Sequence, residues 1–217
     1  MNERKEALER ARQSWEQKNF QAAYELYEQL LRDAPNDAEI LREYARAKYV
    51  EYEDLEQVTQ LFERAVAADP NGSGSALLCL ARLYSWGYGK GYNAALGVYQ
   101  RVLELDPDNV DAYIGIGMLH RKPSSPVTRK ERIEAFRMAA QIAPQRADVH
   151  KNLGMALIED GDQENARKEL EIAEKLLVES GNHQLARSIR ADRQKLETSQ
   201  PITSFAYGKT EPMEWDF

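Results

Sequence analysis

Apolar side chains recur along this chain with the spacing of an α-helix. An early segment shows the pattern clearly, because charged and polar residues separate the members of one apolar face: Phe20, Ala23, Tyr27 and Leu30. Residues that recur every three or four positions share one side of a helix and can be buried together. The pattern therefore predicts amphipathic α-helices that occur in pairs joined by short turns.

The helices belong to a repeated unit whose end is marked by proline. Four prolines that follow an acidic or small residue are spaced 35, 37 and 37 residues apart: Pro35, Pro70, Pro107 and Pro144. An aromatic residue stands eight positions before each of them: Tyr27, Phe62, Tyr99 and Phe136. A small residue stands early in every unit: Ala11, Ala45, Ala81, Gly117 and Gly154. Markers that keep this order over several copies indicate a repeat protein.

Each marker has a physical role in a pair of packed helices. The small residue lets the first helix approach its partner closely, and the aromatic ring then fills the space between adjacent units. The proline cannot continue a helix, so the chain must turn into the next unit. At 106–109 the polar residues around Pro107 can also cap the helix that follows.

This order of small, aromatic and proline markers resembles the tetratricopeptide repeat, whose unit has about 34 residues. The resemblance covers about residues 4–178 in five units. It implies an all-α fold, a right-handed α-α superhelical solenoid of five helix pairs. The chain departs from the family pattern where Arg132 takes an alanine position. It departs again in the last unit, which has Leu170 in the aromatic position and no closing proline.

The turns inside the middle units are longer than in the rest. From the small residue to the aromatic position, the five units span 16, 17, 18, 19 and 16 residues. The added residues must lie between the two helices of units two to four. Glycine and proline gather there at 86–92 and 121–130, so both segments are expected to form enlarged loops.

The chain after the fifth unit predicts an end helix and a tail. Gly181 and Asn182 interrupt the pattern, and residues 183–197 form one further amphipathic segment with an inner face of Leu185, Ile189 and Leu196. A stack of repeats needs such a capping helix, because its last unit otherwise exposes an apolar face. We therefore expect one solenoid domain over residues 1–198 and an extended acidic and aromatic tail over residues 199–217.

Composition narrows the classes of partner. The chain has 29 Lys and Arg residues against 36 Asp and Glu, a net charge of −7, which disfavours a surface built to bind nucleic-acid phosphates or anionic lipid. No apolar run approaches the roughly 18 residues that span a bilayer, and the charged N-terminal segment lacks the apolar core of a signal peptide. The expectation is a cytoplasmic protein with no membrane partner.

Candidate chemistry is sparse. The single cysteine, Cys79, lies in an apolar string and is interpreted as a buried hydrophobic residue, with a reactive thiol as the alternative. The three histidines, His120, His150 and His183, include no pair at the spacing of a helical metal site, so each is interpreted as a surface or interface residue. The sequence contains no phosphate-binding glycine loop. It therefore predicts no enzyme activity, metal or cofactor.

The family resemblance implies that particular positions of each first helix face a concave groove. In this chain those positions carry basic, aromatic and methionine side chains: Arg12, Trp15, Arg42, Arg46, Tyr49, Arg82, Trp86, Met118, Arg121, Lys122, Lys151 and Met155. Arginine pairs with carboxylates through two parallel hydrogen bonds, and tryptophan and tyrosine are frequent binding hot spots. Such a groove suits an acidic peptide with bulky apolar side chains. The alternative is that Glu9, Glu16, Glu39 and Glu43 neutralise the arginines internally.

The tail has the complementary chemistry. It ends in the acidic stretch TEPMEWDF, and its aromatic residues are Phe205, Tyr207, Trp215 and Phe217. It could occupy the groove of its own chain, associate with a second copy, or dock on a separate partner. A plain disordered terminus is the simpler alternative.

These observations predict a non-enzymatic protein-interaction scaffold, an adaptor or assembly factor. Its expected partner is an acidic, aromatic-containing protein segment in the groove, with the tail as a possible regulator. The alternative is an RNA-binding helical-repeat protein, faintly suggested by the segment LFERAV at 61–66 and opposed by the acidic charge. A helical enzyme is the third hypothesis.

Overall fold

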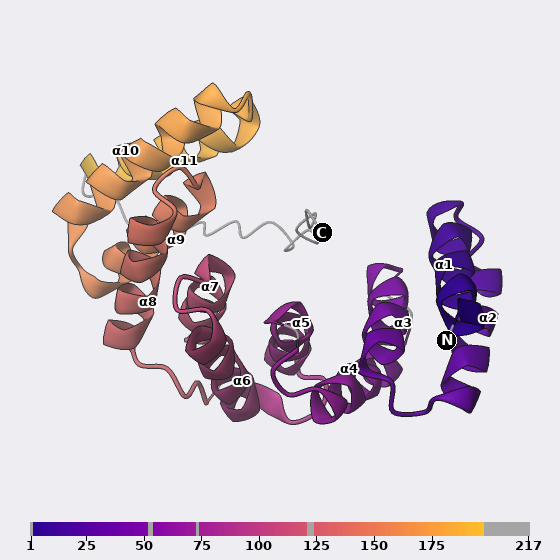
Figure 1. The fold of residues 1–217 in the computed structure, drawn as a ribbon. Coiled ribbons are helices and arrows are strands. Elements are labelled where there is room, and N and C mark those ends of the chain that lie inside the picture. The colour runs from indigo at the N-terminus through magenta and orange to yellow at the C-terminus, as the bar shows by residue number, and fades with distance from the viewer. Residues whose placement is uncertain (1, 52–53, 73, 121–123, 198–217) are drawn as a thin grey trace. The chain divides into compact units, whose positions relative to one another are not determined.

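The computed structural model of the protein describes residues 2–51, 54–72, 74–120 and 124–197. These residues form eleven α-helices and no strand, which confirms the all-α prediction (Figure 1). The helices are α1 (Asn2–Glu16), α2 (Phe20–Asp33), α3 (Ala38–Val50), α4 (Leu55–Ala68), α5 (Gly74–Ser85), α6 (Gly91–Leu105), α7 (Val110–Leu119), α8 (Arg129–Ile142), α9 (Ala147–Asp160), α10 (Gln163–Glu179) and α11 (His183–Glu197). Some predicted site residues lie outside the described part: Arg121, Lys122 and the tail residues Phe205, Tyr207, Trp215 and Phe217.

The chain divides into two compact units. The first runs to Ile142 and contains α1 to α8, and the second begins at Ala143 and contains α9 to α11. In the first unit α1 packs on α2, α3 on α4, α5 on α6 and α7 on α8, and successive pairs meet through the second helix of one and the first helix of the next. That residues 1–198 form one continuous solenoid domain remains a prediction.

Proline and polar caps set the ends of the helices. Ala34, Asp69 and Asp106 each precede a proline and have left the helical conformation, while their N–H groups still hydrogen bond to the last turn of α2, α4 and α6. The next helix then begins at a capping side chain. Asp37, for example, accepts hydrogen bonds from the first N–H groups of α3, and Asn109 does so for α7. The predicted closing role of the prolines is confirmed.

The enlarged turns lie where the spacing predicts them. The segment between α5 and α6 covers 86–90, and α7 ends at Leu119 while α8 begins at Arg129, whereas α1 and α2 are joined by 17–19 alone. Residues 121–123 of the second predicted loop lie outside the described residues. In the first loop Gly87 and Gly89 have φ of 95° and 77°, the left-handed region that favours glycine. The position of Gly89 also requires a small residue, because a Cβ there would lie 2.7 Å from the Tyr84 ring and 3.1 Å from Thr59. This loop therefore packs back on α4 and α5.

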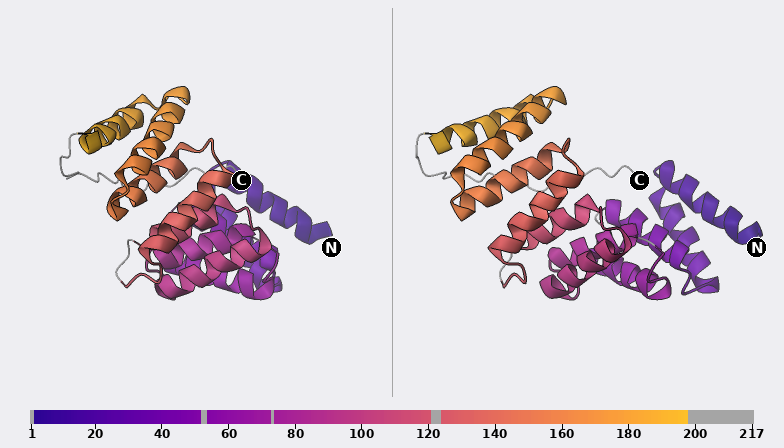
Figure 2. Two further views of the ribbon diagram at one scale, coloured as in Figure 1. Left: turned by 90° about the vertical axis from the view of Figure 1, so that its left-hand side faces the viewer. Right: turned by 60° about the vertical axis from the view of Figure 1, so that its left-hand side comes forward.

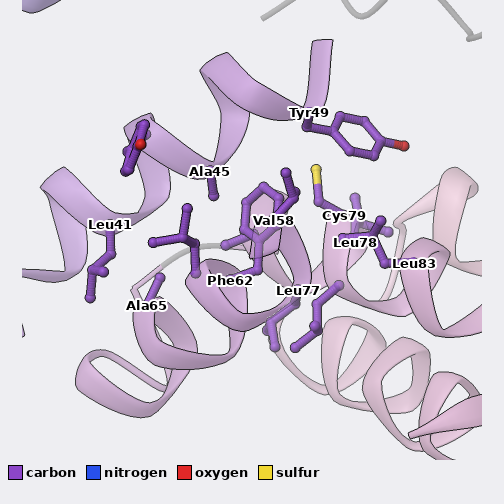
Figure 3. Close-up of a cluster of buried hydrophobic side chains, with 14 of the residues drawn as sticks. Leu41, Ala45, Tyr49, Val58, Phe62, Ala65, Leu77, Leu78, Cys79 and Leu83 are labelled. Atoms are coloured by element: carbon purple, nitrogen blue, oxygen red, sulfur yellow. The ribbon is translucent and has the colours of Figure 1, made fainter. Parts of the chain in front are cut away.

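Small residues on the first helices contact large side chains on the second helices. A Cβ on Gly117 would lie 2.6 Å from the Phe136 ring of the same pair. A Cβ on Gly115 would lie 2.2 Å from the Tyr99 ring of the preceding pair. Phe62 shows the same arrangement in the cluster of Figure 3, where its ring lies between Ala45 of α3 and Leu77 of α5. The predicted roles of the small and aromatic markers are thus confirmed.

Tyrosine hydroxyls add polar contacts between successive pairs. The Tyr44 hydroxyl in α3 donates a hydrogen bond of 2.8 Å to Glu28 Oε1 in α2. The Tyr84 hydroxyl in α5 donates one of 2.5 Å to Glu63 Oε1 in α4. Burial first, and then the hydrogen bond and charge of Glu63, raise the pKa of Tyr84 above its ordinary value. Tyr84 therefore stays protonated at neutral pH. Each of the two tyrosines joins a first helix to the second helix of the preceding pair.

The second unit keeps the same packing with an aliphatic side chain. Gly154 of α9 faces Leu170 of α10, and a Cβ on the glycine would lie 2.8 Å from Leu170 Cγ. α11 lies along α10 and covers it with Leu185, Ile189 and Leu196, as predicted for a capping helix (Figure 2). Leu170 thus takes the part that aromatic rings have in the first unit.

Replacing Gly117 by alanine is expected to destabilise the chain by about 1–3 kcal/mol, because the added methyl group would overlap the fully buried Phe136 ring. Urea denaturation followed by circular dichroism measures the effect. The matched control is Gly97→Ala in α6, where a Cβ meets nothing within 4 Å. This control should raise stability by about 0.4–1 kcal/mol, since alanine favours the helix. Equal stability of both variants would contradict close packing at Gly117.

Candidate peptide-binding face

The predicted groove residues belong to two different units. α1, α3, α5 and α7 form one side of the first unit, called here the first-helix face (Figure 1). It carries most of the predicted residues or is followed directly by them: Arg12, Trp15, Arg42, Arg46, Tyr49, Arg82, Trp86 and Met118. Lys151 and Met155 lie on α9 in the second unit. The candidate site is therefore built from the first unit alone.

Arg12 is bound by the protein's own carboxylates. Its Nε lies 2.8 Å from Glu43 Oε2, and its Nη2 lies 2.7 Å from Glu43 Oε1 and 3.0 Å from Glu39 Oε1. The hydrogen bond and charge of Glu43, followed by those of Glu39, raise the pKa of Arg12 further above its ordinary value. This bidentate pair fastens α1 to α3. At Arg12 the structure therefore has the internal pairing that the sequence left as the alternative.

Arg46 and Arg82 occupy matching places on α3 and α5. Both side chains are half-buried, and both lower the pKa of the neighbouring Cys79 thiol by their positive charge. Burial has the larger, opposite effect and raises the pKa of Cys79 to about 11, so the thiol is protonated at neutral pH. Cys79 is almost fully buried, which confirms its interpretation as a hydrophobic core residue. The positive charges of Arg46 and Arg82 therefore both reach Cys79, which places the two guanidinium groups in the same region of the first-helix face.

On α3 and directly after α5, an aromatic pair connects the core to the surface. The rings of Tyr49 and Trp86 are stacked, with centroids 6.0 Å apart and an interplanar angle of 15°. Tyr49 in turn contacts the buried Phe62 edge-on, so it is 5% exposed, whereas Trp86 is 37% exposed. The backbone N–H of Trp86 donates a hydrogen bond to the backbone carbonyl of Arg82, directly after the last residue of α5. The stack therefore holds a partly exposed indole in a set orientation (Figure 3 shows Tyr49 above Cys79 and Leu78).

Other predicted groove residues contribute mainly to packing. Trp15 lies against Phe20 with ring centroids 6.3 Å apart, and its indole Nε1 is buried with no hydrogen-bond partner in the described part of the chain. Met155 belongs to the core of the second unit. Arg42, Met118 and Lys151 remain half-buried. Little of the Met155 side chain is thus available to a partner, and Trp15 is only partly buried.

Among the described residues, histidines and acidic side chains form contacts between structural elements. No group of three or more His, Cys, Asp and Glu side chains is arranged there to hold a metal ion. His120 contacts the Val127 carbonyl in the first unit, and His150 contacts Glu169 in the second, so both are interface residues as expected. Over the residues searched, none of the helices is both long and apolar enough to span a bilayer.

The sequence does not predict the partners in three of these contacts. The pairing of Glu43 with Arg12 was considered only as a general possibility, and its bidentate form depends on how α1 and α3 are placed. The stack of Tyr49 on Trp86 joins residues of two repeats. The hydrogen bond between His150 and Glu169 joins α9 to α10. A search for opposite charges at matching repeat positions would have found the first contact.

Comparison with known proteins agrees with this geometry. Residues 14–78 match the model of the tetratricopeptide repeat family. A crystal structure of the MamA protein superposes with a TM-score of 0.71 at 20% identity and covers 84% of this chain and 97% of its own. MamA from Desulfovibrio magneticus RS-1 covers 93% of this chain and 98% of its own, with a TM-score of 0.65 and 19% identity.

A further similar structure is YrrB, described as a TPR protein with an unusual peptide-binding site. It superposes with a TM-score of 0.68 at 20% identity, over 85% of this chain and 90% of its own. A search among curated proteins gave no significant match. Identities near 20% show the fold alone. Residues 14–78 match the tetratricopeptide repeat, and the described helices share the fold of these tetratricopeptide-repeat structures.

Proposed function

We propose that the protein is an adaptor or assembly factor that binds an acidic, aromatic-containing peptide segment on the first-helix face. The observation that carries this proposal is that one face holds Arg46 and Arg82, which both act on Cys79 by their charge, and the partly exposed Trp86, which is stacked on Tyr49. Arginine provides bidentate hydrogen bonds to carboxylates, and a held indole offers a large contact area with little loss of side-chain freedom. The combination favours a ligand that carries both acidic and bulky apolar residues.

The centre of the proposed contact lies on α3 and α5. Arg12 on α1 already donates its hydrogen bonds to Glu39 and Glu43, so a ligand carboxylate would have to displace two internal acceptors there. Arg42, which shares α3 with Arg46, adds a third half-buried cation to the centre. Because packed helices hold all these positions before binding, little backbone ordering opposes the association.

The tail is proposed as a ligand of the same chemistry. Residues 210–217, TEPMEWDF, contain three acidic residues together with Met213, Trp215 and Phe217. They complement the arginines and the indole of the first-helix face in both charge and apolar character. Occupation of that face by the tail would regulate access of other ligands or join two copies of the chain.

Arg46→Ala and Arg82→Ala are each expected to weaken binding of a labelled 210–217 peptide by about 1–3 kcal/mol, the range for hydrogen bonds to charged groups. At about 1.4 kcal/mol per factor of ten, this is roughly a 5- to 150-fold rise in Kd. Fluorescence anisotropy on a chain shortened to residues 1–198 measures it without competition from the attached tail. Arg137→Ala, which removes the same charge from an exposed position on α8, is the control. Equal losses of affinity in all three variants would show that only the net charge of the chain matters and would contradict a specific role of Arg46 and Arg82.

Removal of residues 199–217 is expected to raise the affinity of the chain for the added 210–217 peptide, because the attached tail no longer competes for the first-helix face. Titration of full-length and shortened chains with the labelled peptide measures this difference, and sedimentation velocity reports the oligomeric state. A control chain keeps its full length but carries serine at Trp215 and Phe217. It should behave like the shortened chain. Unchanged peptide affinity and unchanged oligomeric state would contradict both tail occupation and tail exchange.

A further inference from the structure

In the second unit, one buried histidine has an oxygen atom in front of each of its ring nitrogens. His150 of α9 is 6% exposed. Its Nδ1 lies 2.7 Å from Glu169 Oε2 of α10, and its Nε2 lies 3.0 Å from the Pro144 carbonyl oxygen in the turn that begins the unit. The ring thus bridges that turn and α10.

The two contacts together require a charged ring. An ionised carboxylate and a backbone carbonyl only accept hydrogen bonds, and a neutral imidazole has one N–H to donate. Neutral His150 would satisfy one oxygen and turn a lone pair toward the other. The imidazolium form donates to both, so the geometry favours protonation over the neutral ring.

The charges around His150 act in the same direction. The hydrogen bond with Glu169 is the largest influence and raises the pKa of His150, against the opposing effect of burial. The Pro144 carbonyl and the charges of Glu169 and Asp148 raise this pKa further. Asp148 is itself paired with Arg146, whose Nη2 lies 2.7 Å from Asp148 Oδ2. Glu169 is therefore the main charged partner of the ring.

We propose that His150 is a pH-dependent clasp, which holds the turn at 143–146 onto α10 when its ring is protonated and loosens this turn when the ring loses its proton. Loss of the proton leaves either the Pro144 carbonyl or the Glu169 carboxylate without a donor. The turn joins α8 to α9, so the clasp controls how firmly the first residues of the second unit are held.

The sign of the pH dependence follows from the raised pKa. In an unfolded chain a histidine titrates near about 6.5, so below that pH both states are charged and the clasp contributes its full stability. Above that pH the folded state retains a proton that the unfolded state has lost. The contribution therefore declines as the pH rises and is gone above the folded pKa of His150. The turn at 143–146 is therefore held more firmly at low pH than at high pH.

Nitrogen NMR of the full-length chain with labelled histidine tests the protonation state directly. We expect one of the three histidine rings, assigned through His150→Gln, to titrate above about 6.5 and to carry protons on both nitrogens below its pKa. Glu169→Gln should lower that pKa by about one pH unit or more, because it removes the nearby opposite charge. Glu164→Gln, on the same helix but paired with exposed Lys168, should leave it in place. A neutral His150 at pH 6.5, or equal shifts in both variants, would overturn the proposal.

Hydrogen exchange tests the mechanical part of the clasp. Amide protection factors at 143–149, corrected for intrinsic exchange, should fall as the pH rises through the pKa of His150, while those of α1 and α2 in the first unit follow no such titration. In Glu169→Gln the fall should move to lower pH together with the pKa. If the protection factors at 143–149 do not change as His150 titrates, the ring is charged but does not act as a clasp.

Discussion

Close contact between a small residue on one helix and a large side chain on its neighbour is the constraint on which this structure depends. Gly117 accepts the Phe136 ring, Gly154 accepts Leu170, and Gly115 accepts the Tyr99 ring of the preceding pair. A helix surface without a Cβ lets the partner axis come near enough for such a ring to be fully covered, and dense packing then leaves no room for adjustment. The register of each helix pair, and of one pair on the next, follows from these contacts.

That register also decides what the arginines of the first helices can do. Because equivalent positions of successive repeats lie on the same face, charged residues spaced by about one repeat become neighbours. Arg12 meets Glu39 and Glu43 and becomes a structural ion pair. Arg46 and Arg82 both act on Cys79 through their positive charge. The same face therefore carries the ion pair of Arg12 and the two arginines that are proposed to bind a ligand.

The second unit shows how buried charge is accommodated where the repeat departs from its pattern. Glu174, almost fully buried on α10, accepts from Arg190 and Arg193 of α11, with its oxygens 2.6 Å from Arg190 Nε and 3.1 Å from Arg193 Nη2. His150 is buried between a carboxylate and a carbonyl. A buried charge without a partner would be strongly unfavourable, so these groups tie α9, α10 and α11 to specific neighbours. In the first unit, tyrosine hydroxyls make comparable contacts to carboxylates, and Arg132 of α8 is a buried cation whose guanidinium lies over the Phe136 ring.

The sequence by itself determined the helices, their pairing, the enlarged turns and the capping helix. These features depend on local periodicity, on proline's missing N–H and on the spacing of small and aromatic residues, which are all visible along the chain. It also predicted a set of groove residues, most of which lie on α1, α3, α5 and α7 or directly after one of these helices. Only the tertiary structure decided that Arg12 is committed to Glu43, that Trp15 is packed against Phe20, that Trp86 is held by Tyr49, and that His150 faces two acceptors. Periodicity shows which face a side chain occupies, but its partner depends on rotamers and on helices brought together from other repeats, and these exist only once the chain has packed.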